Sequence, residues 1–315
     1  MTNWNALYHR LRQAAPALEL RRDEPMSRHT TFRVGGPVPL MALPKGKEAK
    51  VVMETAFRCN VTPFFLGNGS NLLVSDSGYD GFVVKLGGNY SEGYVYTNEL
   101  MVGGAMLLSR AASLALEHGL TGLEWAAGIP GTVGGAVYMN AGAYGGEICQ
   151  VLHQVHVLGQ DGLSEVVANR DCGFGYRRSA FSDGQRLISE AIFLLEPGDP
   201  AEIRAKMDGF AARRREKQPL EYPSAGSTFK RPPAVDGQSV YAAALIEQCG
   251  LKGLTVGGAQ VSEKHAGFIV NRGGATSRDI VELMVRVRER VFRETGVTLE
   301  PEVRYLGLEG EGWNF

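Results

Sequence analysis

Three short segments carry side chains whose types could do chemistry. "FGYRRSAF" places Arg177 and Arg178 after a glycine, "YPSAGSTFKRP" places Ser227 in a turn-prone segment, and "LEPEVRYLG" places Glu302 near a terminal strand. A guanidinium can clamp a carboxylate with two hydrogen bonds, whereas a serine transfers a proton only where neighbouring cations or dipoles tune it. The simpler interpretations are solvated arginines, a turn serine and a surface ion pair between Glu302 and Arg304.

Two glycine-rich segments could hold a ligand. In "LGNGSNLLVSD", residues Gly67 to Asn71 alternate glycines with Asn and Ser, so backbone and side-chain donors can converge on an anion, although a tight turn between strands would also explain the glycines. "GIPGTVGGAVYMNAGAYGGE", residues 128–147, has seven glycines in twenty residues, too many for an ordinary helix or strand interior. We favour a flat or anionic ligand there over close backbone packing. Neither segment is a Walker loop, and Leu72 replaces the third glycine of a dinucleotide fingerprint.

Composition limits the class of protein. The 315 residues are 44% apolar, which allows two or three domains. The 33 basic and 34 acidic residues nearly cancel, so nothing in the bulk charge favours nucleic acid or an anionic membrane. Four scattered cysteines without metal-ligand spacing indicate reduced thiols and no metal site. We expect a cytoplasmic protein, because the sequence shows neither a secretory signal nor an apolar run of about 20 residues.

The elements that must position these segments follow from the hydrophobic periodicity. Helices are predicted over residues 3–13, 46–60, 106–119, 201–217, 241–250 and 277–296. Strands are predicted over residues 30–36, 39–44, 63–67, 71–75, 81–86, 99–105, 154–159, 191–197, 260–263, 266–271 and 297–308. The pattern therefore predicts two successive units that mix helices and strands, and a third unit that follows the helix at 201–217.

Eight segments in order resemble one family. "TTFRVGGP", "LGNGSNLLVSD", "GIPGTVGGAVYMNAGAYGGE", "FGYRRSAF", "AGSTFKRP", "LIEQCGLKG", "GGAQVS" and "LEPEVRYLG" closely resemble the UDP-N-acetylenolpyruvoylglucosamine reductase (MurB) family of peptidoglycan synthesis. The resemblance runs from about residue 27 to 308 and implies an α+β fold of three domains. Residues 1–87 and 88–200 would form an FAD-binding fold of the vanillyl-alcohol-oxidase (PCMH) type, with strand 303–315 returning to the first, and residues 201–302 would bind substrate. Only 49 residues separate Arg177 from Ser227, so the chain resembles the shorter, type II members.

The resemblance also implies the reaction. NADPH would reduce a tightly but non-covalently bound FAD, and the flavin would pass hydride to the enolpyruvyl methylene carbon of UDP-N-acetylglucosamine enolpyruvate, giving UDP-N-acetylmuramate. Hydride arrival pushes negative charge into the substrate carboxylate, which the site must stabilise. By the family's motifs, Arg177 and Glu302 would stabilise that charge, Glu302 as a protonated donor, and Ser227 would deliver the proton.

Further roles are carried over from the family by position. The FAD contacts implied are Arg33, Gly67, Asn68, Gly69, Ser70, Asn71, Gly128, Gly131, Thr132, Gly134, Gly135, Ala136, Asn140 and Gly142. Residues 67–71 would hold the pyrophosphate, and residues 128–142 would line the isoalloxazine and ribityl part. Tyr144, Lys217 and Arg231 would contact the UDP-sugar, and Arg231 stands where other members carry an asparagine. We expect a small-molecule substrate and a monomer or weak homo-oligomer.

Two other functions fit part of the sequence. An FAD-linked oxidase of the same fold would share the glycine-rich segments but should lack the combined Arg177, Ser227 and Glu302 motifs. A non-catalytic UDP-sugar-binding protein would have no reason to retain all three residues. The motifs favour the reductase.

Overall fold

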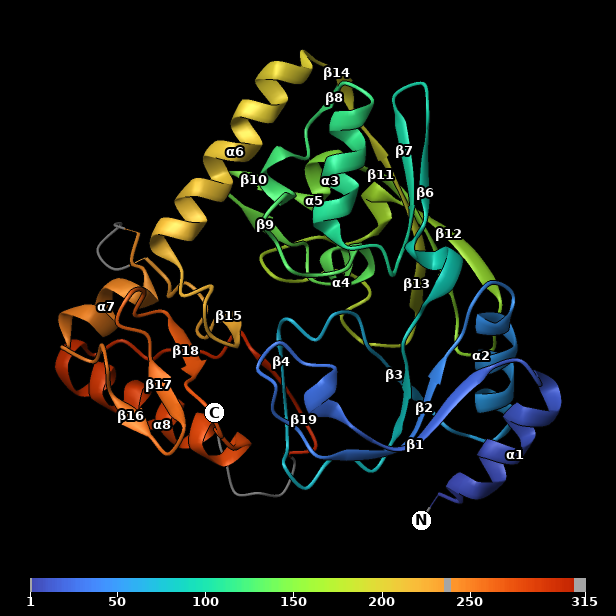
Figure 1. The fold of residues 1–315 in the computed structure, drawn as a ribbon, viewed down its shortest axis with the longest axis horizontal. Coiled ribbons are helices and arrows are strands. Elements are labelled where there is room, and N and C mark those ends of the chain that lie inside the picture. The colour runs from blue at the N-terminus through green and yellow to red at the C-terminus, as the bar shows by residue number, and fades with distance from the viewer. Residues whose placement is uncertain (1, 235–238, 309–315) are drawn as a thin grey trace. The chain divides into compact units, whose positions relative to one another are not determined.

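The computed structural model describes residues 2–234 and 239–308, and its ribbon is drawn in Figure 1. Contacts divide the chain into two compact units. The first unit comprises Met1–Asp23, Pro39–Asn68 and Gly81–Arg213, and the second comprises Glu24–Val38, Gly69–Asp80 and Arg214–Phe315. Each unit is therefore assembled from segments that are far apart in the sequence.

The N-terminal part of the first unit is a small sheet with two helices. Its strand order is β1-β2-β5-β3, with β1 at Glu19–Pro25, β2 at Pro37–Leu43, β5 at Phe82–Val84 and β3 at Pro63–Phe65. Strands β2 and β3 both pair in parallel with β5. Helices α1 (Trp4–Ala14) and α2 (Glu48–Arg58) present apolar residues at helical spacing, and these pack with Leu40 and Phe82 into one core.

The rest of the first unit is built on a five-stranded antiparallel sheet of order β12-β11-β13-β7-β6. The strands are β6 (Gly93–Tyr96), β7 (Glu99–Gly103), β11 (Leu152–Leu158), β12 (Ser164–Ala168) and β13 (Leu187–Leu194). Leu100, Val155 and Ala191 point to one face, where they join a core with α3 (Leu108–Glu117) and α4 (Val133–Tyr138). Helix α6 (Pro200–Lys217) contributes Ile203 and Met207 to the same core.

Short elements complete the first unit. They are β8 (Leu120–Thr121) paired with β14 (Glu196–Pro197), β9 (Gly142–Ala143) paired with β10 (Gly146–Glu147), α5 (Ile148–Val151), and the 3-10 helices at Gly88–Ser91, Glu124–Ala126 and Asn169–Asp171. The β9–β10 hairpin begins shortly after the end of α4. Tyr144 lies at the turn of this hairpin.

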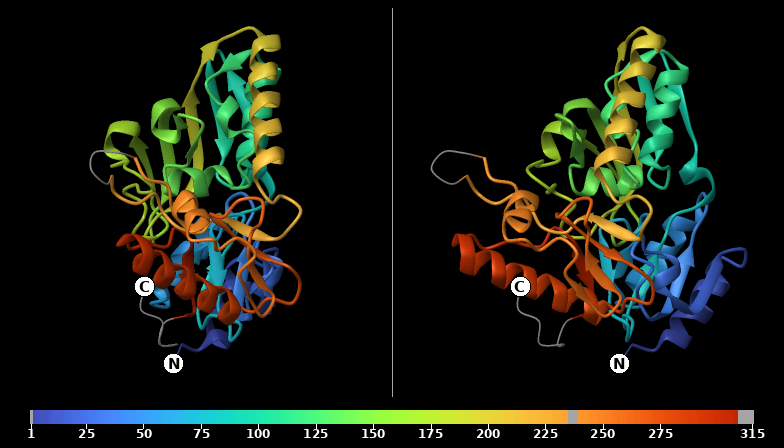
Figure 2. Two further views of the ribbon diagram at one scale, coloured as in Figure 1. Left: turned by 90° about the vertical axis from the view of Figure 1, so that its left-hand side faces the viewer. Right: turned by 60° about the vertical axis from the view of Figure 1, so that its left-hand side comes forward.

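The second unit has a four-stranded antiparallel sheet of order β15-β18-β17-β16. Its elements are β15 (Ser224–Ser227), β16 (Thr255–Val256), β17 (Ala259–Val261), β18 (Phe268–Asn271), α7 (Ala242–Gln248), α8 (Ser277–Thr295) and a 3-10 helix at Met26–Arg28. Helix α8 begins at a capping box of Thr276 with Asp279 and ends at Gly296, which has a left-handed φ of 73°. Figures 1 and 2 show α8 lying along this sheet. Strand β19 (Arg304–Leu306) pairs in parallel with β4 (Leu72–Val74).

Most predicted elements are present. The six predicted helices correspond to α1, α2, α3, α6, α7 and α8. The strand predicted over 30–36 is wrong, because Arg33 and Gly35 have φ values of 56° and 128° and Thr30 Oγ1 closes a turn onto the Val34 carbonyl. The terminal strand is confined to β19, and the glycine-rich segment, predicted to avoid helix, contains α4.

The predicted three-domain boundaries stay a prediction. Three apolar clusters are compatible with them, one built mainly from residues 7–84, one from residues 100–207 and one mainly from residues 225–308. Strand β19 does return to β4, within residues 1–87, while residues 309–315 of the predicted returning strand lie outside the described residues.

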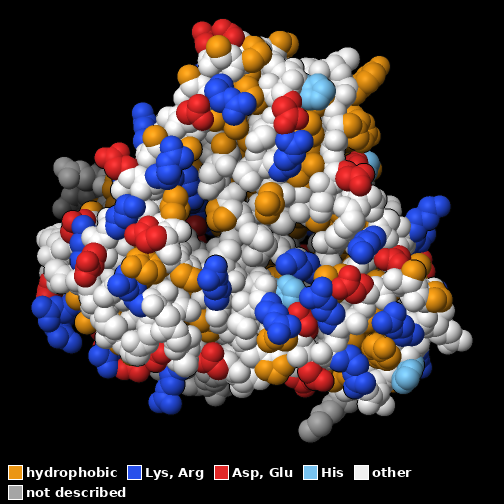
Figure 3. Space-filling view, viewed as in Figure 1, with side chains coloured by type: hydrophobic (Ala, Val, Ile, Leu, Met, Phe, Trp, Pro, Cys, Tyr) orange, Lys and Arg blue, Asp and Glu red, His pale blue; other side chains and the backbone are white. Residues whose placement is uncertain are grey.

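Surface charge, helix length and candidate metal ligands can each be read from the described residues. On the face shown in Figure 3, basic and acidic side chains are mixed. Over residues 2–234 and 239–308, we find no helix with the length and apolar character needed to cross a membrane. The same residues contain no group of three or more His, Cys, Asp or Glu side chains arranged to hold a metal ion.

Candidate active site

Arg177 lies in a tight turn in the first unit. The backbone groups of Gly175 and Arg178 exchange hydrogen bonds of 2.9 and 3.2 Å, and Arg177 between them has a φ of 53°. A left-handed residue other than glycine costs about 1 kcal/mol or more, so the surrounding structure must hold it. The guanidinium carbon lies 5.2 Å from the centre of the Tyr176 ring. The turn therefore fixes the direction in which Arg177 leaves the backbone.

The glycine-rich segment enters α4 through a fully bonded first turn. Val133 N donates to Met106 O at 2.8 Å, and Gly134 N donates to Gly104 O at 2.8 Å. Gly135 N donates to the side chain of Thr132, the N-cap residue, at 3.2 Å. These are the donors that a helix N-terminus would otherwise offer to an anion. The first N–H groups of α4 are thus already bonded to protein acceptors.

Several glycines of this segment are required by packing. A Cβ on Gly134 would lie 3.0 Å from Gly104 O, and one on Gly142 would lie 2.8 Å from Gly146 O. A Cβ on Gly146 would lie 2.1 Å from the Trp125 ring. By contrast, a Cβ on Gly135 would meet only the Thr132 hydroxyl, at 3.4 Å. Close backbone packing, the interpretation we did not favour from sequence, therefore explains three of these glycines.

The 67–71 loop joins β3 to β4 and contains residues of both units. In the first unit, Asn68 Nδ2 donates to Pro130 O at 2.5 Å, and a Cβ on Gly67 would lie 2.6 Å from Thr132 Oγ1. The two glycine-rich segments are therefore in contact there. In the second unit, Gly69 has a φ of 60°, and a Cβ on it would lie 2.1 Å from His29 O. Only glycine fits this position.

The backbone donors of this loop point to an anion. In the part of the chain that the structure describes, the N–H groups of residues 67–71 donate to no protein acceptor. Successive unpaired N–H groups around a left-handed glycine form a concave site for an anion. The loop therefore fits a pyrophosphate better than the start of α4 does.

The segments that carry Ser227 and Glu302 are paired in the second unit. Phe229 and Pro301 form an antiparallel bridge, and Glu302 N donates to Thr228 O at 2.8 Å. The residue that follows Ser227 is therefore directly opposite Glu302. Thr228 is 1% exposed, and its hydroxyl accepts from Ile269 N at 3.1 Å, so this junction is anchored to β18.

Asn71 of the loop contacts the same junction. Its Nδ2 donates to Glu302 O at 3.1 Å, and its carbonyl accepts from Arg304 N at 3.1 Å. These bonds extend the parallel pair of β4 and β19 by one residue toward the loop. Asn71, Ser227 and Glu302, predicted from three separate motifs, thus lie at one place in the second unit.

The other predicted residues are distributed over both units. Tyr144, with a φ of 54°, stacks on Phe210 of α6 with ring centres 4.6 Å apart in the first unit. In the second unit, Lys217 is exposed at the end of α6, and the guanidinium of Arg231 lies over the Tyr241 ring. Arg33 is exposed in the turn after the 3-10 helix Met26–Arg28. Gly128, Gly131 and Ala136 belong to the first unit with Arg177.

Two histidines of the second unit make structural contacts within the protein. His29 Nε2 lies 2.9 Å from Glu24 Oε1, and both side chains are almost completely buried behind the loop glycine Gly69. His265 Nδ1 accepts from Gly267 N at 3.1 Å, and burial lowers the pKa of its imidazole. The pairing of Glu24 with His29 had no detectable signal in the sequence, since neither residue lies in a periodic pattern.

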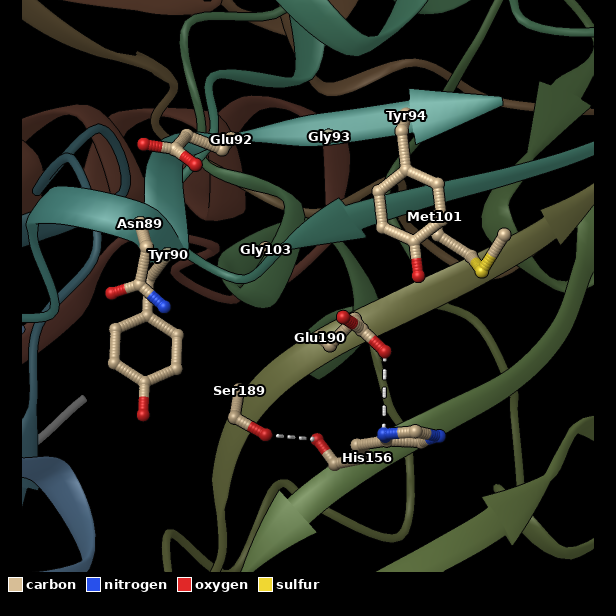
Figure 4. Close-up of a pocket in the computed structure, with 10 residues that line it drawn as sticks. All are labelled: Asn89, Tyr90, Glu92, Gly93, Tyr94, Met101, Gly103, His156, Ser189 and Glu190. Atoms are coloured by element: carbon tan, nitrogen blue, oxygen red, sulfur yellow. Dashed lines mark hydrogen bonds and ion pairs between the residues drawn. The ribbon is translucent and has the colours of Figure 1, made fainter. Parts of the chain in front are cut away.

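A separate cavity lies on the outer face of the five-stranded sheet (Figure 4). It has a volume of about 490 Å³ and is lined by residues such as Tyr94, Met101 and Glu190. Glu190 Oε1 lies 3.2 Å from His156 Nδ1 within it. These side chains alternate along the strands with those that face α3 and α4, so the cavity is on the opposite face from the glycine-rich segment.

The comparisons with known proteins first define the class. Residues 45–167 match the model described as FAD binding domain, so this part of the chain has the fold of an FAD-binding protein. Residues 218–306 match the model described as UDP-N-acetylenolpyruvoylglucosamine reductase, C-terminal domain. The FAD-binding match and the match to the reductase C-terminal domain therefore cover different parts of the chain.

Relatives identify the family. The chain is 44% identical over 302 residues to the UDP-N-acetylenolpyruvoylglucosamine reductase of Caldanaerobacter subterraneus subsp. tengcongensis, covering 96% of this chain and 98% of the relative. It is 45% identical over 304 residues to that of Agathobacter rectalis, covering 93% and 95%. The solved structure of the reductase from Thermus caldophilus superposes with a TM-score of 0.77 at 37% identity, covering 92% of this chain and 98% of that one. The chain belongs to the UDP-N-acetylenolpyruvoylglucosamine reductase family.

These matches confirm the predicted family, the α+β flavin fold, the enzyme class and FAD as cofactor. The residues of the site fit that cofactor on structural grounds as well. The unpaired N–H groups of residues 67–71 suit its pyrophosphate, and the bare stretch around Gly135 leaves room for a flat ring beside the backbone.

Proposed function

We propose that this chain reduces UDP-N-acetylglucosamine enolpyruvate to UDP-N-acetylmuramate, the step of peptidoglycan synthesis expected from its motifs, with NADPH as reductant. The observation that supports the proposal is the junction of Thr228 with Glu302, because this backbone hydrogen bond pairs the segment of the exposed Ser227 with the segment of Glu302. FAD, when bound, supplies the hydride that reaches the enolpyruvyl methylene carbon. The chain's own groups would then manage charge and the proton.

Each group has a distinct task in this scheme. Arg177, aimed by its tight turn, would pair with the substrate carboxylate as charge moves into it. Glu302 would donate a hydrogen bond to the same carboxylate, which requires its proton. Ser227 would deliver a proton to the carbon next to the carboxylate. Lys217 and Arg231 would offset the charge of the nucleotide diphosphate, and Tyr144 would contact the sugar.

The nucleotide sugar and NADPH are small soluble anions, so we place the reaction in the cytoplasm. Near-zero net charge over the chain implies that such ligands are held by the local donors and cations named above. The loop of residues 67–71 would hold the FAD pyrophosphate, because its backbone donors are unpaired in the described structure.

The test separates the two halves of the reaction. Flavin absorbance is followed anaerobically, first during reduction by NADPH and then during reoxidation by the enolpyruvyl nucleotide sugar. In Ser227→Ala, we expect reduction at the wild-type rate and reoxidation slowed by more than about tenfold. Ser224→Ala, the same change three residues earlier in β15, is the matched control and should reoxidise normally.

Either of two results would contradict the proposal. A wild-type protein whose reduced flavin is reoxidised by oxygen but not by the nucleotide sugar would indicate an oxidase. Reoxidation in Ser227→Ala within a few fold of wild type would remove the serine from the proton step.

A further inference from the structure

Arg177 can act on a substrate carboxylate only if its turn is held in place, and the turn is not self-supporting. Its left-handed φ of 53° is an unfavourable conformation for an arginine. Apart from the two bonds between Gly175 and Arg178, the turn needs contacts from outside to keep one geometry. A displacement of about 1 Å of a catalytic group can cost about a hundredfold in rate.

Asn140 supplies such a contact. It is 2% exposed and adopts a left-handed φ of 44° just after α4. Its Nδ2 donates to Gly175 O at 3.2 Å, on the N-terminal side of the turn. The C-terminal side is held by Ser179, whose hydroxyl donates to Tyr138 O at 2.6 Å. The residues that end α4 thus hold both sides of the turn that carries Arg177.

The Asn140 amide is itself fixed. Its Nδ2 also donates to Glu147 Oε2 at 3.1 Å, and its Oδ1 accepts from Cys149 N at 3.0 Å. An amide nitrogen has two hydrogens, and both are bonded to protein acceptors. The FAD contact predicted for Asn140 stays a prediction and would come from its backbone, because both side-chain donors are bonded to protein acceptors. Its contacts lead instead to the turn of Arg177.

We propose that Asn140 is a positioning residue, which acts through Gly175 to hold the Arg177 guanidinium where it meets the substrate carboxylate. The proposal rests on the function proposed above. The Asn140 amide should then matter for flavin reoxidation by the nucleotide sugar, because a substrate carboxylate is present only in that half of the reaction. Flavin binding and reduction by NADPH should not depend on it.

The test variant is Asn140→Gly, because glycine accepts the left-handed backbone and only the amide is lost. We expect flavin content and the rate of flavin reduction to match wild type, and reoxidation by the enolpyruvyl nucleotide sugar to slow by about tenfold to a hundredfold. Asn169→Ala is the matched control. Its Nδ2 bonds the carbonyls of Cys149 and Leu152 near the same hairpin, but it does not contact the turn, so it can lower the unfolding temperature without slowing reoxidation.

A double-mutant comparison distinguishes positioning from general damage. If Asn140 acts only through Arg177, then adding Asn140→Gly to Arg177→Ala should change reoxidation by less than about twofold. Three results would overturn the inference: normal reoxidation in Asn140→Gly, the same loss in the Arg177→Ala background, or a loss explained wholly by missing FAD. If the wild type itself fails to use the nucleotide sugar, the proposed function fails first, and this outcome is separate from all three.

Discussion

The neighbouring glycines Gly134 and Gly135 should respond oppositely to alanine. A methyl group at 134 would lie 3.0 Å from Gly104 O and 3.4 Å from Ile188 O, both backbone atoms that cannot rotate away. At 135 it would meet only the Thr132 hydroxyl, at 3.4 Å. Both positions lie in α4, where alanine is better than glycine by about 0.5–1 kcal/mol. Overpacking in a core typically costs about 1–3 kcal/mol.

The overpacking cost and the gain in helix propensity together predict whether each variant is less or more stable than wild type. Gly134→Ala should lose about 1–2 kcal/mol, because the overpacking cost exceeds the gain in helix propensity. Gly135→Ala should gain about 0.5–1 kcal/mol in the FAD-free protein. At about 2–4 °C per kcal/mol, the unfolding midpoint of the FAD-free protein should fall by about 2–8 °C in Gly134→Ala and rise by about 1–4 °C in Gly135→Ala. The midpoints are measured by circular dichroism after the flavin has been removed.

Flavin affinity then tests what lies beside Gly135. If the flavin ring lies along this backbone, a methyl group there should weaken FAD binding by about tenfold although the apoprotein is more stable, which titration of apoprotein with FAD would measure. A Gly134→Ala protein as stable as wild type would refute the close approach of residues 104 and 134. A Gly135→Ala protein with unchanged FAD affinity would refute the ring position.

Three further predictions concern stability and thiol chemistry. Gly146→Ala should be strongly destabilised, by about 2–4 kcal/mol in denaturant unfolding, because its Cβ would overlap the ring of Trp125. Burial raises the pKa of Glu124, but hydrogen bonds from Thr121 and the Gly122 backbone outweigh it and leave the pKa below the ordinary value of 4.5. The stability that Glu124 contributes over Glu124→Gln should therefore be full above about pH 4.5 and disappear as the pH falls through the lowered pKa. Burial raises the pKa of Cys172 to about 11, so a thiol reagent at pH 8 should label it only after unfolding.

Short motifs were enough to predict the family and its enzyme class. The segments around Arg177, Ser227 and Glu302 carried the resemblance, and the predicted family and enzyme class are confirmed by the relatives. The helices were predictable for a local reason as well. Helix α8, for example, shows its apolar face, its capping box and its terminal Gly296 within 21 consecutive residues, 276–296.

Helix α4 could not be predicted, because its stability comes from distant residues. Two glycines in six residues argue against a helix by propensity. The bonds that support it run to Gly104 and Met106, about 30 residues earlier, and its cap is Thr132. The same limit applies to the junction of Thr228 with Glu302, which joins residues more than 70 positions apart. Neither contact has a periodicity that a sequence pattern could reveal.

The two glycine-rich segments have different physical reasons for their glycines. In 128–147, three of the seven glycines allow backbones and the Trp125 ring to approach closely, and the first two donors of α4 are bonded to protein carbonyls. In 67–71, one glycine is required by a left-handed φ, and the backbone donors around it are unpaired in the described structure. An anion is attracted by unpaired donors, whereas a flat ring needs only a surface without side chains. The loop of residues 67–71 should therefore determine affinity for the FAD pyrophosphate, and the longer segment should determine where the ring can lie.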